Sequence, residues 1–141
     1  LVERLHRQLL DVIKDELERL GQTDINSVQA LLLYNIGEAE LTPGELRSRG
    51  HYLGSNVSYN LKQLVDKGYI RDVRSDVDRR SKRVSLTAAG LNVRDRLAEL
   101  FDRQLGSVEQ VGGVDQTAME QTNKSLQRLE RFWADQVRYR L

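Results

Sequence analysis

The chain has 141 residues, of which 30% are charged and 39% hydrophobic, and its formal net charge is +1. This length fits one domain, or one small domain plus the helices that assemble it. The lack of cysteine with only two histidines argues against disulfides and against metal sites built from thiolates or several histidines. We expect no metal and no cofactor; the alternative is a metal site with acidic ligands. No stretch approaches the roughly 18 consecutive apolar residues of a membrane span, so we expect a cytoplasmic protein without a membrane partner.

Two helices are predicted in the first 37 residues. Leucine, isoleucine and valine recur at helical spacing from Leu5 to Leu20, and Gly21 ends this pattern. The second helix follows Asn26, which forms a capping-box pattern with Gln29, and ends at Gly37. Its apolar residues are dense enough to predict burial on most sides: Val28, Leu31, Leu32 and Ile36.

A short and a longer helix follow, each with clear start and stop residues. Thr42 and Pro43 supply a cap and a first-turn proline, and Gly50 closes this short helix. The next helix runs from Ser55 to about Lys67 and is closed by Gly68.

The pattern then changes to that of a hairpin. Residues 69–74 and 82–86 predict two short strands on either side of the polar loop 75–81. Thr87 caps a long helix, the Gly112-Gly113 pair interrupts the chain, and Asp115 caps a last amphipathic helix.

The net charge hides an uneven distribution. Residues 42–87 carry ten basic and five acidic side chains, a local charge of +5, whereas the rest of the chain carries −4. A basic middle flanked by acidic ends favours an anionic partner for the middle alone. The alternative is a solvated surface on which charges happen to cluster.

The order helix, short helix, helix, hairpin predicts a winged helix-turn-helix, whose second paired helix enters the DNA major groove. In the helix starting at Ser55, apolar residues form one stripe, and the residues off the stripe suit base edges and phosphates. These DNA-binding candidates are Ser55, Asn56, Ser58, Tyr59 and Lys62. The alternative is that they only face water.

The hairpin tip carries a second set of candidates. Arg79, Arg80, Lys82 and Arg83 lie at or beside the tip, where an arginine can enter the narrow, electronegative minor groove. We expect Asp76 or Asp78 to orient one arginine while another contacts DNA. A salt-bridge cluster that only stiffens the turn is the alternative.

The stretch from Ser75 to Gly90, with Asp78-Arg79-Arg80 at the tip and Leu86-Thr87-x-x-Gly90 at the end, resembles the signature of the MarR family of bacterial transcriptional regulators. Residues 25–29 and 41–46 resemble the openings of that family's second and third helices. The resemblance implies that Arg79 reaches the minor groove and that Asp78 and Arg80 hold the wing together.

The resemblance also implies that the N- and C-terminal helices intertwine with those of a second copy. We therefore expect a mainly α fold with a β-hairpin wing, divided into an N-terminal dimerisation helix (1–24), a winged helix-turn-helix lobe (25–87) and C-terminal dimerisation helices (88–141). A dimer reads two half-sites about one helical turn apart. The interface candidates are Leu5, Leu9, Phe132, Trp133 and Val137; the alternative is an intramolecular core.

A small aromatic or phenolic effector is a further implication of the resemblance. The candidates for lining its site are aromatic residues that carry a polar atom: Tyr34, His51, Tyr52 and Trp133. The alternative is that each of them is an ordinary packing residue. The absence of cysteine excludes sensing by thiol oxidation.

No enzyme motif is present: the chain lacks G-x-S-x-G, H-E-x-x-H and Walker sequences, and His51 near Ser55 is a weak hydrolase hint. We therefore expect a homodimer that binds pseudo-palindromic double-stranded DNA, as a repressor released by a small ligand rather than as an activator. The alternative is a helical dimer that does not bind DNA and acts as a protein-interaction or ligand-binding module.

Overall fold

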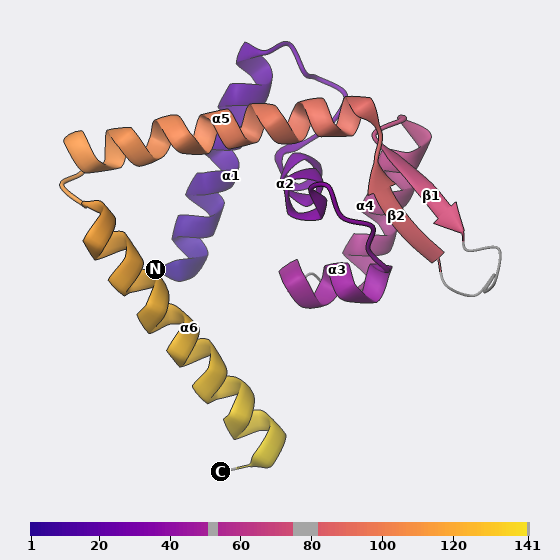
Figure 1. The fold of residues 1–141 in the computed structure, drawn as a ribbon. Coiled ribbons are helices and arrows are strands. Elements are labelled where there is room, and N and C mark those ends of the chain that lie inside the picture. Colours follow the sequence, from indigo (N-terminus) through magenta and orange to yellow (C-terminus); the bar gives the residue numbers. More distant parts are fainter. Residues whose placement is uncertain (51–53, 75–81, 141) are drawn as a thin grey trace. The chain divides into compact units, whose positions relative to one another are not determined.

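The structure, a computed structural model, describes residues 1–50, 54–74 and 82–140 (Figure 1). Along these residues the elements follow the expected order, with the bounds α1 (Val2–Arg19), α2 (Ser27–Ile36), α3 (Pro43–Gly50), α4 (Gly54–Asp66), β1 (Ile70–Arg74), β2 (Lys82–Leu86), α5 (Ala88–Gln110) and α6 (Gln116–Tyr139). The fold class is therefore confirmed as mainly helical with one hairpin. Residues 1–100 form one compact part and residues 101–141 another; the expected functional division at residues 24 and 87 stays a prediction.

The predicted helix caps are present. The Asn26 side chain accepts a hydrogen bond from the Gln29 backbone N–H at 2.8 Å, and the Gln29 side chain accepts one from the Asn26 N–H at 3.1 Å. Thr42 caps α3 through the Glu45 N–H at 3.1 Å, and Asp115 caps α6 through the Ala118 N–H at 2.8 Å. Each cap satisfies a backbone donor that the first turn of a helix leaves unpaired, so these helix starts are encoded locally.

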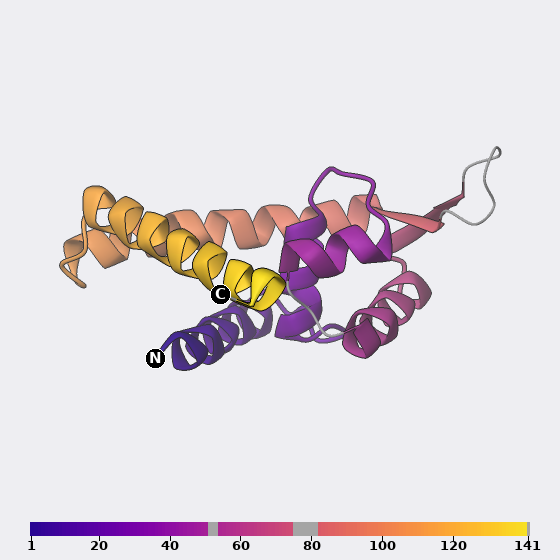
Figure 2. The same ribbon diagram turned by 90° about the horizontal axis from the view of Figure 1, so that it is seen from below.

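The hairpin pairs β1 and β2 antiparallel, with Ile70 opposite Leu86 and Arg74 opposite Lys82. Its two strands lie side by side and project from the helices (Figures 1 and 2). A third segment, which the sequence did not predict, joins β2 from the other side: Leu41 and Val84 exchange backbone hydrogen bonds of 3.0 and 2.8 Å. Because Leu41 directly precedes Thr42, the cap of α3, this bridge ties the helix-turn-helix to the hairpin.

One core fills residues 1–100. It draws on every element of this part, with α1 packing on α2, α2 on α3 and β2, and α3 on α4. Its largest fully buried side chains are Ile13, Leu32, Leu33, Ile36, Leu46, Leu64, Ile70, Leu97, Val57 and Val84.

The expectation that α2 is buried on most sides is wrong at its first turn. Leu32 and Ile36 are buried, but Leu31 is only half-buried and Val28 is 38% exposed. The neighbours of α2 in this part include α1, α3 and β2, and Gln29 also donates a hydrogen bond to Asn60 of α4. These contacts leave the Val28 side chain partly exposed.

Residues 101–141 contain the end of α5 and all of α6, and none of their side chains that the structure describes is buried. Large apolar side chains are therefore exposed along α6. In the described part of the chain, no helix has the length and apolar character to cross a bilayer.

Candidate nucleic-acid interface

Helix α4 divides into two faces, as its sequence predicts. Val57, Leu61 and Leu64 are buried, whereas Asn56, Ser58, Tyr59 and Lys62 are exposed. Tyr59 is 64% exposed, which is unusual for a large aromatic side chain on a packed helix. Ser55 is the second residue of α4. The predicted DNA-binding residues with described side chains therefore share the solvent side of one helix.

The C-terminal end of α4 is tied to the loop between α1 and α2. The Tyr69 hydroxyl donates to Asp24 Oδ2 at 2.6 Å and accepts from Gln22 Nε2 at 2.5 Å, and Lys67 Nζ donates to the Asp24 carbonyl. Burial, reinforced by the Asp24 carboxylate, raises the pKa of Tyr69 to about 12. The hydrogen bond from Tyr69 in turn lowers the pKa of Asp24. This cluster fixes where the helix ends.

The Leu-Thr-x-x-Gly end of the hairpin motif has a structural role in the same place. Thr87 Oγ1 donates to the Gly68 carbonyl at 2.6 Å, the Thr87 N–H donates to the Tyr69 carbonyl at 3.0 Å, and the Gly90 N–H donates to Thr87 Oγ1 at 3.3 Å. A Cβ at Gly90 would lie 2.2 Å from the Tyr69 carbonyl oxygen. The motif therefore locks the start of α5 against the turn that joins α4 to β1.

The hairpin strands carry basic residues toward the predicted tip. Arg83 is exposed, and Lys82 is the first residue of β2. On β1 the Arg71 Nε donates to the Ser85 Oγ across the strands at 3.1 Å. The predicted tip residues lie outside the described residues: Asp76, Asp78, Arg79 and Arg80.

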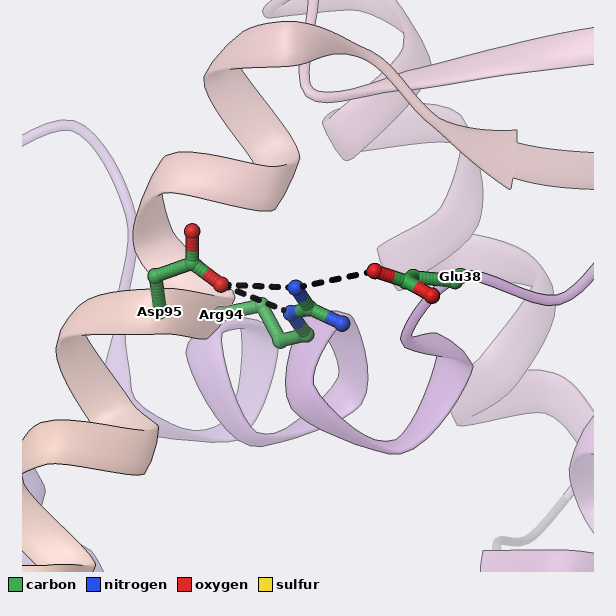
Figure 3. Close-up of polar contacts among 3 residues, drawn as sticks. All are labelled: Glu38, Arg94 and Asp95. Carbon is green, nitrogen blue, oxygen red and sulfur yellow. Dashed lines mark hydrogen bonds and ion pairs between the residues drawn. The ribbon is translucent and has the colours of Figure 1, made fainter.

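Arg94 joins α5 to the segment that follows α2. Its Nη2 lies 2.7 Å from Asp95 Oδ1 and 3.5 Å from Glu38 Oε1, so the guanidinium lies between two carboxylates (Figure 3). The hydrogen bond that Arg94 donates to the Asp95 carboxylate is the main cause that raises the pKa of Arg94. Because its donors face these carboxylates, Arg94 acts as a bridge within residues 1–100.

The predicted effector residues belong to different parts of the chain. Tyr34 is on α2 in the first compact part and Trp133 is on α6 in the second, while His51 and Tyr52 lie outside the described residues. The described residues also contain no cluster of three His, Asp or Glu side chains able to hold a metal ion.

The predicted interface residues are largely exposed. Leu5, Phe132, Trp133 and Val137 are exposed and Leu9 is half-buried. A surface that a partner covers in an assembly exposes apolar side chains when the chain is considered alone. The assignment of these residues to a dimer interface stays a prediction.

Sequence reasoning missed the residues that hold α4 in place. Asp24, Tyr69 and Leu41 make their contacts with partners more than 40 residues away in the chain. Periodicity and capping patterns report on neighbours within a few residues, so they carry no signal for such pairs.

Comparison with known proteins identifies the family of this fold. A model described as the MarR family matches residues 23–81. The exopolysaccharide II synthesis transcriptional activator ExpG of Rhizobium meliloti is 41% identical over 142 residues, which cover 99% of this chain and 71% of ExpG. This level of identity over nearly the whole chain extends the similarity beyond the helix-turn-helix.

Solved structures agree with this assignment. The transcriptional regulator SlyA matches with a TM-score of 0.80 at 16% identity, covering 99% of this chain and 96% of SlyA. Streptococcus pneumoniae FabT in complex with DNA matches with a TM-score of 0.71 at 25% identity, covering 95% and 93%. The winged-helix fold is thus confirmed, and the relatives are transcription regulators rather than enzymes. The chain belongs to the MarR family and is a DNA-binding transcriptional regulator.

Proposed function

We propose that the protein binds a pseudo-palindromic duplex DNA site as a homodimer, with α4 of each copy in the major groove. The observation that carries this proposal is the division of α4 into a buried apolar stripe and an exposed polar face with Asn56, Tyr59 and Lys62. An asparagine amide pairs with the adenine edge, and a lysine with guanine or phosphate. The exposed face therefore has the chemistry for direct readout of bases.

The hairpin adds a second contact in this proposal. Its strands project from the helices (Figure 2) and carry the exposed Arg83. Arg79 at the tip is the residue we assign to the minor groove, with Arg80, Lys82 and Arg83 on the flanking phosphates and Asp76 or Asp78 orienting one guanidinium. The local charge of +5 over residues 42–87 supports binding to a polyanion.

The exposed apolar side chains in the second compact part, residues 101–141, support the proposal of a homodimer. Phe132, Trp133 and Val137 are exposed on α6. A groove of about 630 Å³ lies between the end of α5 and the start of α6, with Leu105, Met119 and Leu126 on its walls. A second copy that covers these residues would bring two α4 helices to two half-sites.

We propose activation rather than repression as the main regulatory outcome. ExpG, at 41% identity over nearly the whole chain, is named a transcriptional activator of exopolysaccharide II synthesis. This likeness favours activation over the repressor expected from the family resemblance. It also makes promoters of exopolysaccharide genes the first DNA to test.

For the effector we propose a small aromatic acid or phenol, with Tyr34 and Trp133 as the described candidates for contact. Both are exposed aromatic side chains with a polar atom. Salicylate is a suitable probe, and its expected effect is a change in DNA affinity that Tyr34→Ala removes.

The test is selection of DNA fragments by the purified full chain, followed by fluorescence anisotropy on a selected fragment and on a scrambled one. We expect a strong preference for the selected site and a steep loss of affinity between low and physiological salt, because several phosphates are contacted. A salt-independent interaction with protein partners, and none with DNA, would favour the helical interaction module instead.

Arg79→Ala tests the hairpin contact. Removing an arginine from the minor groove should weaken binding about 5-fold to 150-fold, since one good contact contributes about 1–3 kcal/mol. Arg96→Ala removes the same charge from an exposed position on α5 and serves as the matched control. Equal affinities of the two variants for the selected site would refute the assignment of Arg79.

A further inference from the structure

Two amide side chains, those of Gln29 and Asn60, connect the backbone at the start of α2 with the backbone in the first turn of α4. Gln29 Oε1 accepts a hydrogen bond from the Asn26 N–H at 3.1 Å, and Gln29 Nε2 donates to Asn60 Oδ1 at 3.3 Å. Asn60 Nδ2 then donates to the Asn56 carbonyl at 2.9 Å. We refer to the chain Asn26, Gln29, Asn60 and Asn56 as the amide relay.

The amide relay has a fixed direction. In both Gln29 and Asn60 the amide oxygen accepts a hydrogen bond from the α2 side, and the NH₂ group donates one in the direction of the first turn of α4. Turning either amide over would place two donors or two acceptors face to face. Gln29 is only 4% exposed, and leaving its amide unpaired there would be costly. The relay therefore has one satisfied arrangement.

This arrangement adds a constraint that the apolar core does not supply. Burial of Val57, Leu61 and Leu64 holds α4 on the core, but apolar contact is non-directional and tolerates a small rotation of the helix. Hydrogen bonds weaken steeply when their angle changes. Asn60 thereby sets the rotation of the turn that carries Asn56, whose own side chain is exposed.

We propose that Asn60 is a positioning residue for base recognition, acting through the Asn56 backbone. The inference rests on the proposed contact of α4 with the major groove. Hydrogen bonds to base edges require placement within about 0.5 Å, whereas attraction to phosphates is largely insensitive to such shifts. Asn60 therefore governs the ratio of specific to non-specific affinity, and leaves the non-specific affinity itself unchanged.

The first test is Asn60→Ala in the full chain, measured by anisotropy on the selected and the scrambled fragment. We expect the affinity for the selected site to fall about fivefold, the effect of one amide hydrogen bond, with the scrambled-site affinity and the salt slope unchanged. Gln63→Ala is the matched control, because Gln63 is half-buried on the same helix and is outside the relay. Alanine favours a helix more than asparagine, so unfolding of α4 would not explain the loss.

Gln29→Glu tests the relay from its other end. Glutamate still accepts the hydrogen bond of the capping box but has no donor for Asn60. We expect the same fall in the affinity ratio, and no additional fall when Gln29→Glu is combined with Asn60→Ala. Ser27→Glu adds the same charge to the first turn of α2 and should leave the ratio unchanged.

The outcomes separate this inference from the proposed function. An unchanged ratio in Asn60→Ala, or equal losses on both fragments, would overturn the positioning role while specific DNA binding stands. A wild-type protein that prefers no selected sequence would instead overturn the proposed function.

Discussion

The two compact parts of the chain differ in how their apolar residues are covered. Every buried side chain that the structure describes belongs to residues 1–100, where α1 to α5 and the hairpin share one core. Residues 101–141 carry apolar side chains at helical spacing, and these remain exposed. The first part is therefore stabilised by its own chain, whereas the second presents a surface that a partner would complete.

The difference follows from what a helix needs in order to be stable in water. An amphipathic helix gains most of its stability from burying its apolar face. Fully burying one large apolar side chain contributes about 1.5–3 kcal/mol. Helix α6 realises only part of this within the described chain, because none of its residues is buried and Met119, Leu126 and Leu129 are 40–46% exposed. Variants in the two parts should consequently behave differently.

The largest expected effect is that of truncating the core of the first part. Leu33 is 0% exposed, so Leu33→Ala leaves a cavity and should lower the free energy of unfolding by about 3 kcal/mol. Urea denaturation followed by circular dichroism measures this loss, which should be the same at every protein concentration. Leu126→Ala on α6 removes the same atoms from an exposed position; an equal, concentration-independent loss there would contradict the comparison.

A matched pair of glycines on α5, one in each part, compares the local packing within the first part with that within the second. Gly90→Ala should lower the free energy of unfolding by about 2 kcal/mol or more, because its Cβ would meet the Tyr69 carbonyl oxygen. A Cβ at Gly106 would meet open space, so Gly106→Ala should raise the free energy of unfolding by about 0.5–1 kcal/mol through helix propensity. Thermal unfolding of both variants provides the measurement, and a stable Gly90→Ala protein would show that the start of α5 is not locked.

Trp133→Ala should weaken association rather than folding. Trp133 is 60% exposed in the single chain, and an aromatic anchor at an interface typically contributes about 2 kcal/mol, which is a dissociation constant raised about 30-fold. Analytical ultracentrifugation at several protein concentrations measures this dissociation constant. Gln127→Ala, at another exposed position on α6, is the control. A monomeric wild-type protein would refute the interface.

A smaller loss of stability than those at Leu33 and Gly90 is expected in the polar cluster around Tyr69. Tyr69→Phe should lower the free energy of unfolding by about 1 kcal/mol at neutral pH, because the hydroxyl that joins Asp24 and Gln22 is lost. Tyr59→Phe removes an exposed hydroxyl and should have little effect.

The same cluster predicts a pH dependence. The pKa of Tyr69 is raised to about 12, so its contribution is complete below the unfolded value near 10 and is lost as the pH rises from about 10 toward 12. The pKa of Asp24 is lowered, chiefly by Tyr69, so its contribution is present above about pH 4 and is lost as the pH falls. The difference between wild type and Tyr69→Phe should thus be greatest near neutral pH; a constant difference in urea titrations from acid to alkaline pH would rule out this coupling.

Much of the fold was predictable because its start and stop signals are local. Asn26, Thr42 and Asp115 cap helices as their neighbours in sequence predict, and the buried stripe of α4 follows from its periodicity. The hairpin was predictable from two short runs around a polar loop. These features depend on residues within four positions of one another, or on one short loop.

The contacts that place the candidate interface were not predictable in this way. Leu41 pairs with Val84, and Gln29 with Asn60, across 31 residues or more. Neither residue type nor spacing reveals such pairs, because the partner is chosen by how the elements pack. The expected burial of Val28 failed for the same reason: density of apolar residues does not say which side of a helix the neighbours cover.

The sequence by itself determined the order of the elements, the basic middle of the chain and the polar face of α4, since periodicity, caps and charge act over short distances. Only the tertiary structure decided how α4 is held. The amide relay, the Asp24–Tyr69 cluster and the contact of Gly90 with the Tyr69 carbonyl exist only when distant segments meet. Directional hydrogen bonds and close packing then fix an orientation that the apolar pattern alone leaves open.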